Sequence, residues 1–231
     1  MPITAIPDAI RRHTGSALWE TEDIGRSQAD VLKIGDMYLK TGAEGSLVRS
    51  AQAQEYFHKK GLTAPLIEFV QADGRDWLLM RAVPGRYACD EEIMREPVKL
   101  ARMLGETVRM LHETDFSDCP LSSANAHMLE AAEKETGFPF AGDTSLLRHD
   151  VLLHGDMCLP NIFFGENGFT GFIDLGESGP GDRHFDLYWA MWSLEYNLKT
   201  PDYNGIFMDA YGRDVFDKAR YQLCAKLSEC V

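Results

Sequence analysis

Apolar residues in the first part of the chain come in short bursts separated by turn residues. Within residues 23–40 two bursts lie on either side of Gly35, and residues 66–70 and 77–82 lie on either side of residues 72–75, which read Ala-Asp-Gly-Arg. Short apolar runs joined by a glycine-containing turn are typical of β-hairpins. The sequence therefore predicts two hairpins here.

One helix is predicted between these hairpins and another after them. Residues 50–60 contain no turn residue and end at Gly61, which predicts a helix stopped by a C-cap glycine. Val83-Pro84-Gly85 then breaks the pattern and is the predicted hinge between two lobes. From Val98 to Leu111 apolar residues recur at helical spacing, which predicts a long amphipathic helix that begins at Pro97.

The remainder of the chain predicts helices around a small group of strands. Residues 128–134 predict a short helix and 151–153 a buried strand, while 162–164 and 169–173 predict a hairpin with its turn at 165–168. From Phe185 onward we expect two or three helices, interrupted at 199–201 and at Gly212. Strands come first and helices later, which favours an α+β fold with two lobes, residues 1–83 and 84–231, over an alternating βαβ fold.

Composition and charge narrow the class of ligand. The 231 residues carry a formal net charge of −13, which disfavours nucleic acid and anionic membrane surfaces as partners and would attract a cationic ligand. No apolar run is long enough to cross a bilayer, and the N-terminus lacks the apolar core of a signal peptide. The five scattered cysteines indicate neither a disulfide framework nor a zinc site. We therefore expect a cytoplasmic protein, monomeric or dimeric.

The strongest chemical signal lies at residues 151–176, VLLHGDMCLPNIFFGENGFTGFIDLG. Asp156 follows a buried-type strand, Asn161 comes five residues later, and Asp174 closes the next hairpin. Phosphoryl transfer needs a carboxylate that orients or deprotonates the attacking hydroxyl, and oxygen ligands for magnesium. An asparagine side chain suits this metal because its carbonyl oxygen binds a hard cation without adding negative charge beside the nucleotide. The three residues together therefore predict a kinase active site.

This stretch resembles the H-G-D-x-x-x-x-N and I-D-x-G motifs of the aminoglycoside phosphotransferases, small-molecule kinases related to protein kinases. The resemblance extends in order over nearly the whole chain, with weaker matches in residues 25–31, 38–40, 78–83 and 112–120. It implies a bilobal protein-kinase-like fold with a small β-rich N-lobe, residues 1–83, and a mostly helical C-lobe, residues 84–231. It also implies transfer of the γ-phosphoryl group of ATP, or alternatively GTP, to a small hydroxylated substrate with Mg²⁺ as cofactor.

The same resemblance assigns roles to particular residues. Asp156 would accept or orient the proton of the substrate hydroxyl, and Asn161 and Asp174 would bind magnesium. In the N-lobe, Lys40 would contact the phosphates and Ser27, with its neighbours, would cover them. Tyr38 would stack on the base, and backbone groups of Arg81 and Val83 would pair with the adenine edge. Asp186 occupies the place of a structural aspartate.

Other residues near the motif predict structure more than chemistry. His154 is expected to hold the loop through hydrogen bonds, and Cys158 lacks an adjacent base that would make it a nucleophile. Trp189, Trp192 and Tyr196 fall on helical spacing, which is typical of core residues.

Three departures from the family pattern bear on activity and substrate. The glutamate that usually pairs with the phosphate-binding lysine is replaced by Ser50, and Glu55 is about 140° away around a helix. The segment between Pro120 and Val151 is short. Near the C-terminus, residues 225–226 read Ala-Lys where carboxylates that meet substrate amines are expected.

Three functions therefore remain open from the sequence. The first is a kinase for an aminoglycoside or a related compound. The second is a kinase for another small alcohol, of the choline, homoserine or sugar type. The third is a nucleotide-binding pseudokinase, which the serine at position 50 supports and the complete set Asp156, Asn161 and Asp174 opposes.

Overall fold

The computed structural model describes residues 6–15, 19–21 and 30–230. The chain divides into two compact units, residues 1–83 and 84–231, here called the N-terminal and the C-terminal unit. The division falls between Val83 and Pro84, inside the segment whose sequence breaks the strand pattern.

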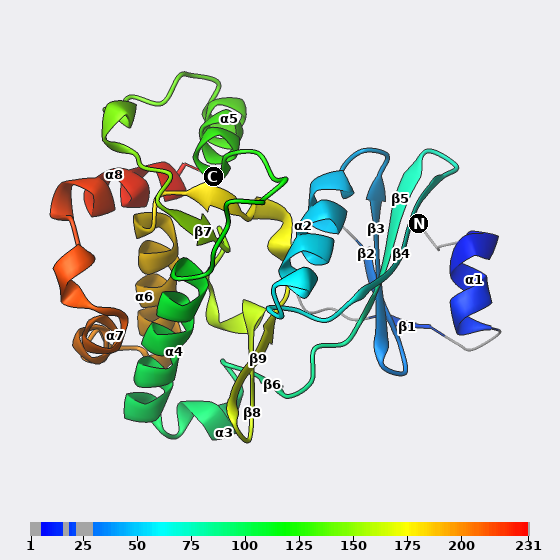
Figure 1. The fold of residues 1–231 in the computed structure, drawn as a ribbon, viewed down its shortest axis with the longest axis horizontal. Helices are drawn as coiled ribbons and strands as arrows, with labels where there is room; N and C mark the ends of the chain where they lie inside the picture. Colours follow the sequence, from blue (N-terminus) through cyan, green and yellow to red (C-terminus); the bar gives the residue numbers. More distant parts are fainter. Residues whose placement is uncertain (1–5, 16–18, 22–29, 231) are drawn as a thin grey trace. The chain divides into compact units, whose positions relative to one another are not determined.

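The N-terminal unit is built on an antiparallel sheet of five strands in the order β1-β2-β3-β5-β4 (Figure 1). Both predicted hairpins are confirmed. Gly35 turns the first with φ +56°, and Asp73 and Gly74 turn the second with φ of 54° and 72°. Two consecutive left-handed residues are the conformation that a tight two-residue hairpin requires. The strands are β1 Glu20–Thr21, β2 Asp30–Ile34, β3 Met37–Ala43, β4 Leu66–Ala72 and β5 Arg75–Arg81.

Two helices accompany this sheet. The predicted helix is confirmed as α2, Val48–Lys59, and Gly61 follows it with φ +73°. Helix α1, Asp8–Thr14, was not predicted, and an N-terminal unit with a single helix was a wrong interpretation. Its seven residues present one buried apolar side chain, Ile10, which packs with core residues of the sheet. Such a helix has too few apolar positions to show a helical period.

Asp76 connects the sheet to the start of α2. Its side chain is fully buried and accepts hydrogen bonds from the backbone N–H of Gly45 at 3.0 Å and of Leu47 at 2.8 Å. Burial raises the pKa of Asp76, but hydrogen bonds from Gln71 and these two N–H groups lower it below its usual value. This carboxylate satisfies the N–H of Leu47, the N-cap residue of α2, and an N–H of the turn before it.

The C-terminal unit is mostly helical, as expected. Helix α4 begins at Pro97, and α5 is longer than predicted because Ser123 caps its N-terminus through the Ala126 N–H and Gly137 ends it with φ +74°. No helix of the described residues is long and apolar enough to span a bilayer. The helices are α3 Glu91–Met94, α4 Pro97–His112, α5 Ala124–Thr136, α6 His184–Leu198, α7 Asn204–Tyr211 and α8 Lys218–Ser228.

Small strand pairs support the loops of this unit. The predicted hairpin is confirmed as β8, Ile162–Gly165, with β9, Gly168–Phe172. Strand β6, Arg86–Tyr87, pairs with β8, and β10, Gly179–Gly181, pairs with β7, Val151–Leu153. Neither β6 nor β10 was predicted, because a two-residue strand and the sequence Gly-Pro-Gly have no apolar alternation.

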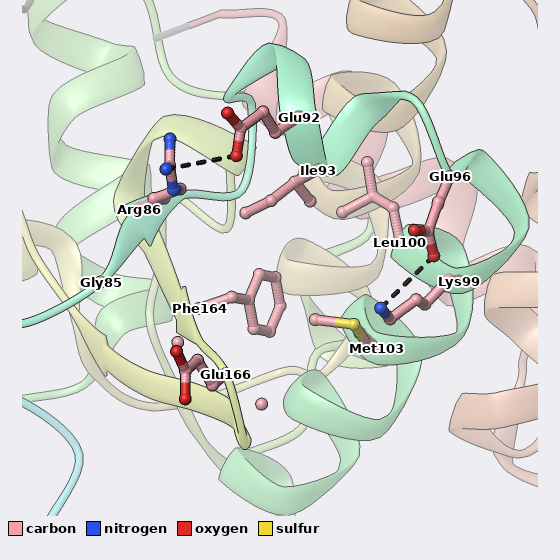
Figure 2. A pocket seen from close by; sticks show the side chains of 12 residues that line it. Gly85, Arg86, Glu92, Ile93, Glu96, Lys99, Leu100, Met103, Phe164 and Glu166 are labelled. Carbon is pink, nitrogen blue, oxygen red and sulfur yellow. Dashed lines mark ion pairs between the residues drawn. The ribbon is translucent and has the colours of Figure 1, made fainter.

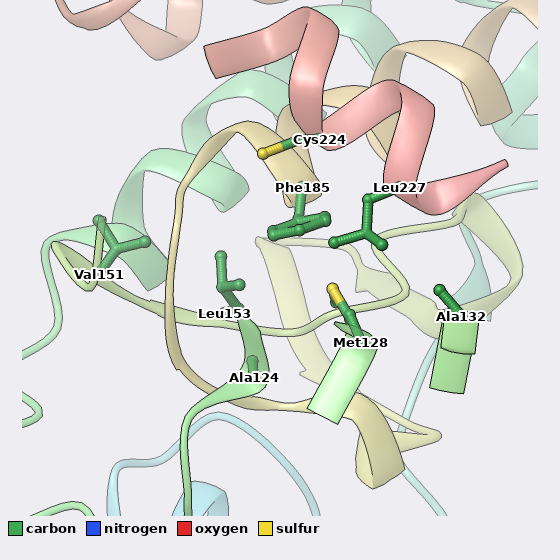
Figure 3. Packing of buried hydrophobic residues seen from close by; sticks show 8 residues of the cluster. All are labelled: Ala124, Met128, Ala132, Val151, Leu153, Phe185, Cys224 and Leu227. Atoms are coloured by element: carbon green, nitrogen blue, oxygen red, sulfur yellow. The ribbon is translucent and has the colours of Figure 1, made fainter. Parts of the chain in front are cut away.

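A core cluster ties β7 to three helices of this unit (Figure 3). Phe185 of α6 is fully buried and lies among side chains from α5, β7 and α8. Because β7 leads directly into residues 154–161, this packing fixes the strand from which the chemically interesting loop departs. The buried members are Ala124, Met128, Ala132, Val151, Leu153, Phe185, Cys224 and Leu227.

Gly105 allows α4 and α7 to approach closely, so its replacement by alanine should destabilise the protein. An added Cβ would lie 2.4 Å from the Phe207 carbonyl oxygen and 2.8 Å from the Ala210 Cβ. We expect Gly105→Ala to lower the free energy of unfolding by about 1–3 kcal/mol in denaturant titrations.

The matched control is Gly205→Ala in α7, where the nearest atom to an added Cβ is a side-chain nitrogen of Arg213 at 3.5 Å. That substitution should leave stability unchanged or raise it by up to about 1 kcal/mol, since alanine is the better helix former. Equal stability of the two variants would contradict close helix packing at Gly105.

Candidate active site

The loop between β7 and β8 carries the His-Gly-Asp motif, and one glycine decides its path. Gly155 has φ +91°, and a Cβ at this position would lie 2.4 Å from the carbonyl oxygen of Glu177. A side chain is therefore excluded by both backbone conformation and space. The chain reaches Asp156 directly after this turn.

Asp156 and Asn161 are in contact across the loop. The Asn161 side-chain amide donates to the Asp156 carboxylate at 2.8 Å and to the Asp156 backbone carbonyl at 3.0 Å. The Asn161 backbone carbonyl in turn accepts from the Ile173 N–H at 3.0 Å. The residue after Ile173 is Asp174, so these bonds bring the loop and the end of the hairpin together.

The orientation of Asn161 fits a metal ligand. The Asn161 amide nitrogen donates both of its hydrogen bonds to Asp156, so the amide oxygen of Asn161 points away from Asp156. Asp174 has φ 58° and ψ 58°, a left-handed conformation that few residues other than glycine, asparagine and aspartate adopt. An amide oxygen and a carboxylate are donors that a hard divalent cation prefers.

His154 stabilises the loop, in agreement with its predicted structural role. The ring is fully buried, its Nδ1 accepts from the Asp156 N–H at 3.2 Å, and its Nε2 lies 2.9 Å from the Ile173 carbonyl oxygen. Because Nδ1 accepts, the proton is on Nε2, which donates to the carbonyl. One imidazole thus connects both backbone segments of the site.

Asp186 is the second support of the loop. This fully buried carboxylate accepts from the backbone N–H groups of His154 and Gly155, each at 2.9 Å. It also lies 3.1 Å from His112 Nε2, and His112 Nδ1 lies 2.8 Å from the Tyr211 hydroxyl. The sequence singled out Asp186 but gave no indication that His112 and Tyr211 are its partners.

The chain is similar in sequence to known phosphotransferases. Residues 141–224 match the model of the "Phosphotransferase enzyme family". The chain is 36% identical over 207 residues to the "Probable aminoglycoside 3'-phosphotransferase" of Lactococcus lactis subsp. lactis, with 80% of this chain and 79% of that protein covered. It is 30% identical over 206 residues to the aminoglycoside 3'-phosphotransferase of Streptomyces fradiae, with 75% and 76% covered.

The chain belongs to the aminoglycoside phosphotransferase family. Its fold is shared with a crystal structure of aminoglycoside-3'-phosphotransferase of type VIII, with a TM-score of 0.74, 22% identity and 97% and 98% of the two chains covered. The expected α+β, protein-kinase-like fold class is confirmed. As a member of this family the chain is an ATP-dependent kinase.

In this phosphotransferase, Cys158 is not a reactive thiol. Burial raises the pKa of Cys158 well above its usual range, and the neighbouring Asp156 charge raises it further. The next residue, Leu159, donates its N–H to Ser193 Oγ of α6 at 2.9 Å. Ser193 is a loop support that sequence reasoning missed, because a serine within a helix has no distinguishing pattern.

The nucleotide-contacting residues expected in the phosphotransferase N-lobe lie in the sheet of the N-terminal unit. Lys40 is half-buried on β3 and pairs with Val31 and Leu78 of the neighbouring strands. Tyr38, on the same strand, is half-buried with Lys33 Nζ 5.4 Å from its ring centroid. Ser27, expected to cover the phosphates, lies outside the described residues.

The end of β5 is the expected adenine-contacting segment. The Arg81 N–H donates to the Pro65 carbonyl at 3.0 Å, so the Arg81 carbonyl is the backbone group that could accept from adenine. Val83 follows as a buried residue. On α2, Ser50 is half-buried and Glu55 is exposed.

A cavity of about 530 Å³ in the C-terminal unit is separate from this set of residues (Figure 2). Phe164 and Leu100 contribute apolar lining, and two ion pairs are at its wall, Arg86 with Glu92 at 3.2 Å and Lys99 with Glu96 at 3.3 Å. Its lining includes none of the predicted site residues. Arg86 and Lys99 are each paired with a glutamate there, and we assign the cavity no part in phosphoryl transfer.

The prediction that the aromatic residues of α6 form core is wrong for two of them. Trp192 is 41% exposed and Tyr196 is 53% exposed, while Trp189 is half-buried. Helical spacing shows that residues share one face of a helix, but it does not show whether another element covers that face.

Asp182 connects the start of α6 to α8, and we expect it to produce acid sensitivity. Burial raises its pKa, but hydrogen bonds from His184, Arg220 and the Arg148 N–H outweigh this and lower it to about 2 from an ordinary 3.8. Because the pKa is lower in the folded protein, the carboxylate stabilises the fold above about pH 4, and this contribution disappears as the pH falls toward 2.

Between pH 4 and pH 2 the free energy of unfolding should therefore fall by about 2 kcal/mol less in Asp182→Asn than in wild type. Urea titrations at several pH values measure the two losses. Asp202→Asn, at an exposed position, is the control and should follow the wild-type pH dependence. A wild-type slope in Asp182→Asn would show that another carboxylate controls acid unfolding.

Proposed function

We propose that this protein transfers the γ-phosphoryl group of ATP to a hydroxyl of an aminoglycoside. The observation that carries this proposal is the contact between Asp156 and Asn161, with Asp174 joined to them through Ile173. Family membership supports the acceptor class, since the relatives carry the name aminoglycoside 3'-phosphotransferase. A fold neighbour has been determined with ADP and streptomycin.

Asp156 would be the catalytic base. Its carboxylate is half-buried, and one of its oxygens is held by the Asn161 amide. A carboxylate fixed in this way can accept a hydrogen bond from the acceptor hydroxyl and orient its oxygen toward the γ-phosphorus. The proton would pass to Asp156 as the phosphorus–oxygen bond forms and ADP leaves.

Asn161 and Asp174 would hold magnesium, through the side-chain oxygen of the first and the carboxylate of the second. The cation would neutralise charge on the phosphate oxygens. The nucleotide contacts proposed for the N-terminal unit are Lys40 and Ser27 with phosphates, Tyr38 with the base, and backbone groups of Arg81 and Val83 with the adenine edge. GTP is the alternative donor.

A kinase for another small alcohol is the second candidate. One specific observation favours it. Lys226 of α8 lies in the register where acidic residues would meet substrate amines, and its Nζ is 3.4 Å from the Ala141 carbonyl oxygen. A fold neighbour is described as a choline/ethanolamine kinase family protein, with a TM-score of 0.53 and 14% identity. The nucleotide-binding pseudokinase is the third.

A coupled ADP-release assay with kanamycin, streptomycin, hygromycin B, choline, homoserine and glucose separates these candidates. Turnover with an aminoglycoside alone supports the proposal, and turnover with choline, homoserine or glucose alone replaces it. Thermal stabilisation by ATP without turnover of any compound would identify a pseudokinase. Expression in a susceptible bacterium should then raise the inhibitory concentration of the accepted drug, as expected for a cytoplasmic resistance enzyme.

Asp156→Asn should abolish turnover and leave ATP binding intact. The amide keeps the shape of the side chain but cannot accept the proton, and loss of a general base reduces kcat by about 10²–10⁴-fold. Steady-state kinetics measure the loss, and calorimetric titration measures ATP affinity.

The matched control is Glu166→Gln, an acid-to-amide change at the exposed turn between β8 and β9, which should leave kcat unchanged. Retention of more than a tenth of wild-type kcat by Asp156→Asn would remove Asp156 from the base role.

Asp174→Asn should weaken Mg²⁺-dependent nucleotide binding. Asparagine tolerates the left-handed backbone at this position, so the substitution removes charge without adding backbone strain. We expect ATP affinity in excess Mg²⁺ to fall at least about 10-fold while affinity measured in EDTA is unchanged, because the lost interaction passes through the cation. Equal affinity of both proteins in Mg²⁺ would exclude Asp174 as a metal ligand.

A further inference from the structure

A continuous row of aromatic rings lies along one side of α6. Trp189 and Trp192 meet edge to face at 5.5 Å, and Trp192 stacks on Tyr196 at 5.2 Å with an interplanar angle of 11°. The row ends at Lys199, whose Nζ lies 4.3 Å from the Tyr196 ring centroid. We call Trp189, Trp192 and Tyr196 the aromatic row.

The exposure of this row requires an explanation. Trp192 and Tyr196 are among the exposed large hydrophobic side chains of the described chain, at 41% and 53%. Two neighbouring exposed rings present apolar surface and π faces to solvent, and such surface commonly marks a binding site.

The row is adjacent to the catalytic loop. Ser193, in the same helix, accepts from the Leu159 N–H at 2.9 Å, and Leu159 is three residues from Asp156. Tyr196 is one helical turn, about 5 Å, beyond Ser193 along the axis. At the other end, Tyr188 contacts Trp189 at 5.2 Å and Tyr221 of α8 at 6.2 Å. The row therefore lies on the helix that supports the catalytic loop through Ser193.

The C-terminal helix lacks acidic groups at two positions where they would bind substrate amines, so the aromatic rings are the alternative binding groups. Residues 225–226 are Ala-Lys, so two positions where acidic groups would meet a polyamine carry none. The Tyr196 ring already binds an ammonium group, that of Lys199. Tryptophan and tyrosine faces attract ammonium groups through their quadrupole, more strongly where water is partly excluded.

We propose that the aromatic row is an acceptor subsite in which Trp192 and Tyr196 bind a protonated amino group of the substrate, and that Lys199 occupies the Tyr196 face until the acceptor displaces it. This inference rests on the proposed function, because it specifies which part of an aminoglycoside the subsite recognises. The acceptor class is an amine-bearing sugar whose ammonium charge is met by ring faces.

Three substitutions should respectively raise, leave unchanged and lower the KM for kanamycin. Tyr196→Leu keeps an apolar side chain but removes the π face, and should raise KM about 5-fold. Tyr196→Phe keeps the face and should remain within about 2-fold of wild type. Lys199→Asn removes the competing ammonium and should lower KM about 2–5-fold. Asparagine suits the left-handed conformation of Lys199, φ 61°.

The KM for ATP and the value of kcat should be unchanged in all three variants, a separation that a general loss of folding would not produce. Val98→Ala, at an exposed position of α4, is the control and should match wild type throughout. An N-acetylated kanamycin, which lacks the charge, should show no difference between Tyr196→Leu and Tyr196→Phe. Equal kanamycin KM for wild type, Tyr196→Leu and Lys199→Asn would overturn the subsite.

A failure of the proposed function can be distinguished from a failure of the subsite. If wild type turns over no aminoglycoside, kanamycin binding is measured by calorimetry instead. Weaker binding by Tyr196→Leu and normal binding by Tyr196→Phe would still support the subsite, and equal binding by all proteins would overturn it. A wild-type dimer that Tyr196→Leu converts to monomer with unchanged kanamycin affinity would assign the row to a second copy of the chain and overturn the proposal.

Discussion

The buried carboxylate of Asp186 is the interaction on which the site depends. It accepts from two consecutive backbone N–H groups, those of His154 and Gly155, at the point where the chain leaves β7. A carboxylate that is removed from water needs such donors, because an unpaired buried charge is very costly. The loop and the start of α6 are therefore fixed to each other, and the position of Asp156 follows from that connection.

The remaining contacts extend this connection outward. His154 joins the loop to the end of the hairpin, and the Asn161 amide joins the end of the loop back to Asp156. Each bond satisfies a polar group that would otherwise be unpaired in a mostly buried region. The result is a preorganised group of oxygen atoms, a requirement of phosphoryl transfer, where catalysis is mainly positioning and electrostatic stabilisation.

The acceptor side of the molecule differs in chemistry from this polar site. Helix α6 contributes Asp186 to the loop support and, further along, the exposed rings of Trp192 and Tyr196. A single helix thus connects the support of the catalytic loop with a surface suited to an amine-bearing ligand.

Local pattern determined much of the fold. The turns at Gly35 and at Asp73-Gly74, the start of α4 at Pro97 and the β8–β9 hairpin were all predicted, because each depends on residues close together in sequence. The family was identified by resemblance to its motifs, and the kinase chemistry was predicted from Asp156, Asn161 and Asp174, which lie close together in sequence.

Tertiary structure decided what depends on residues distant in sequence. The contact of His112 with Asp186 spans 74 positions, and the short strand Gly179–Gly181 exists because it pairs with β7. The prediction that the aromatic row is core was wrong for Trp192 and Tyr196, since helical spacing places residues on one face whether or not another element covers it. The sequence by itself determined the chemistry and the local elements. Burial, pairing partners and the character of the acceptor surface depend on which segments meet in space, and periodicity carries no information about that.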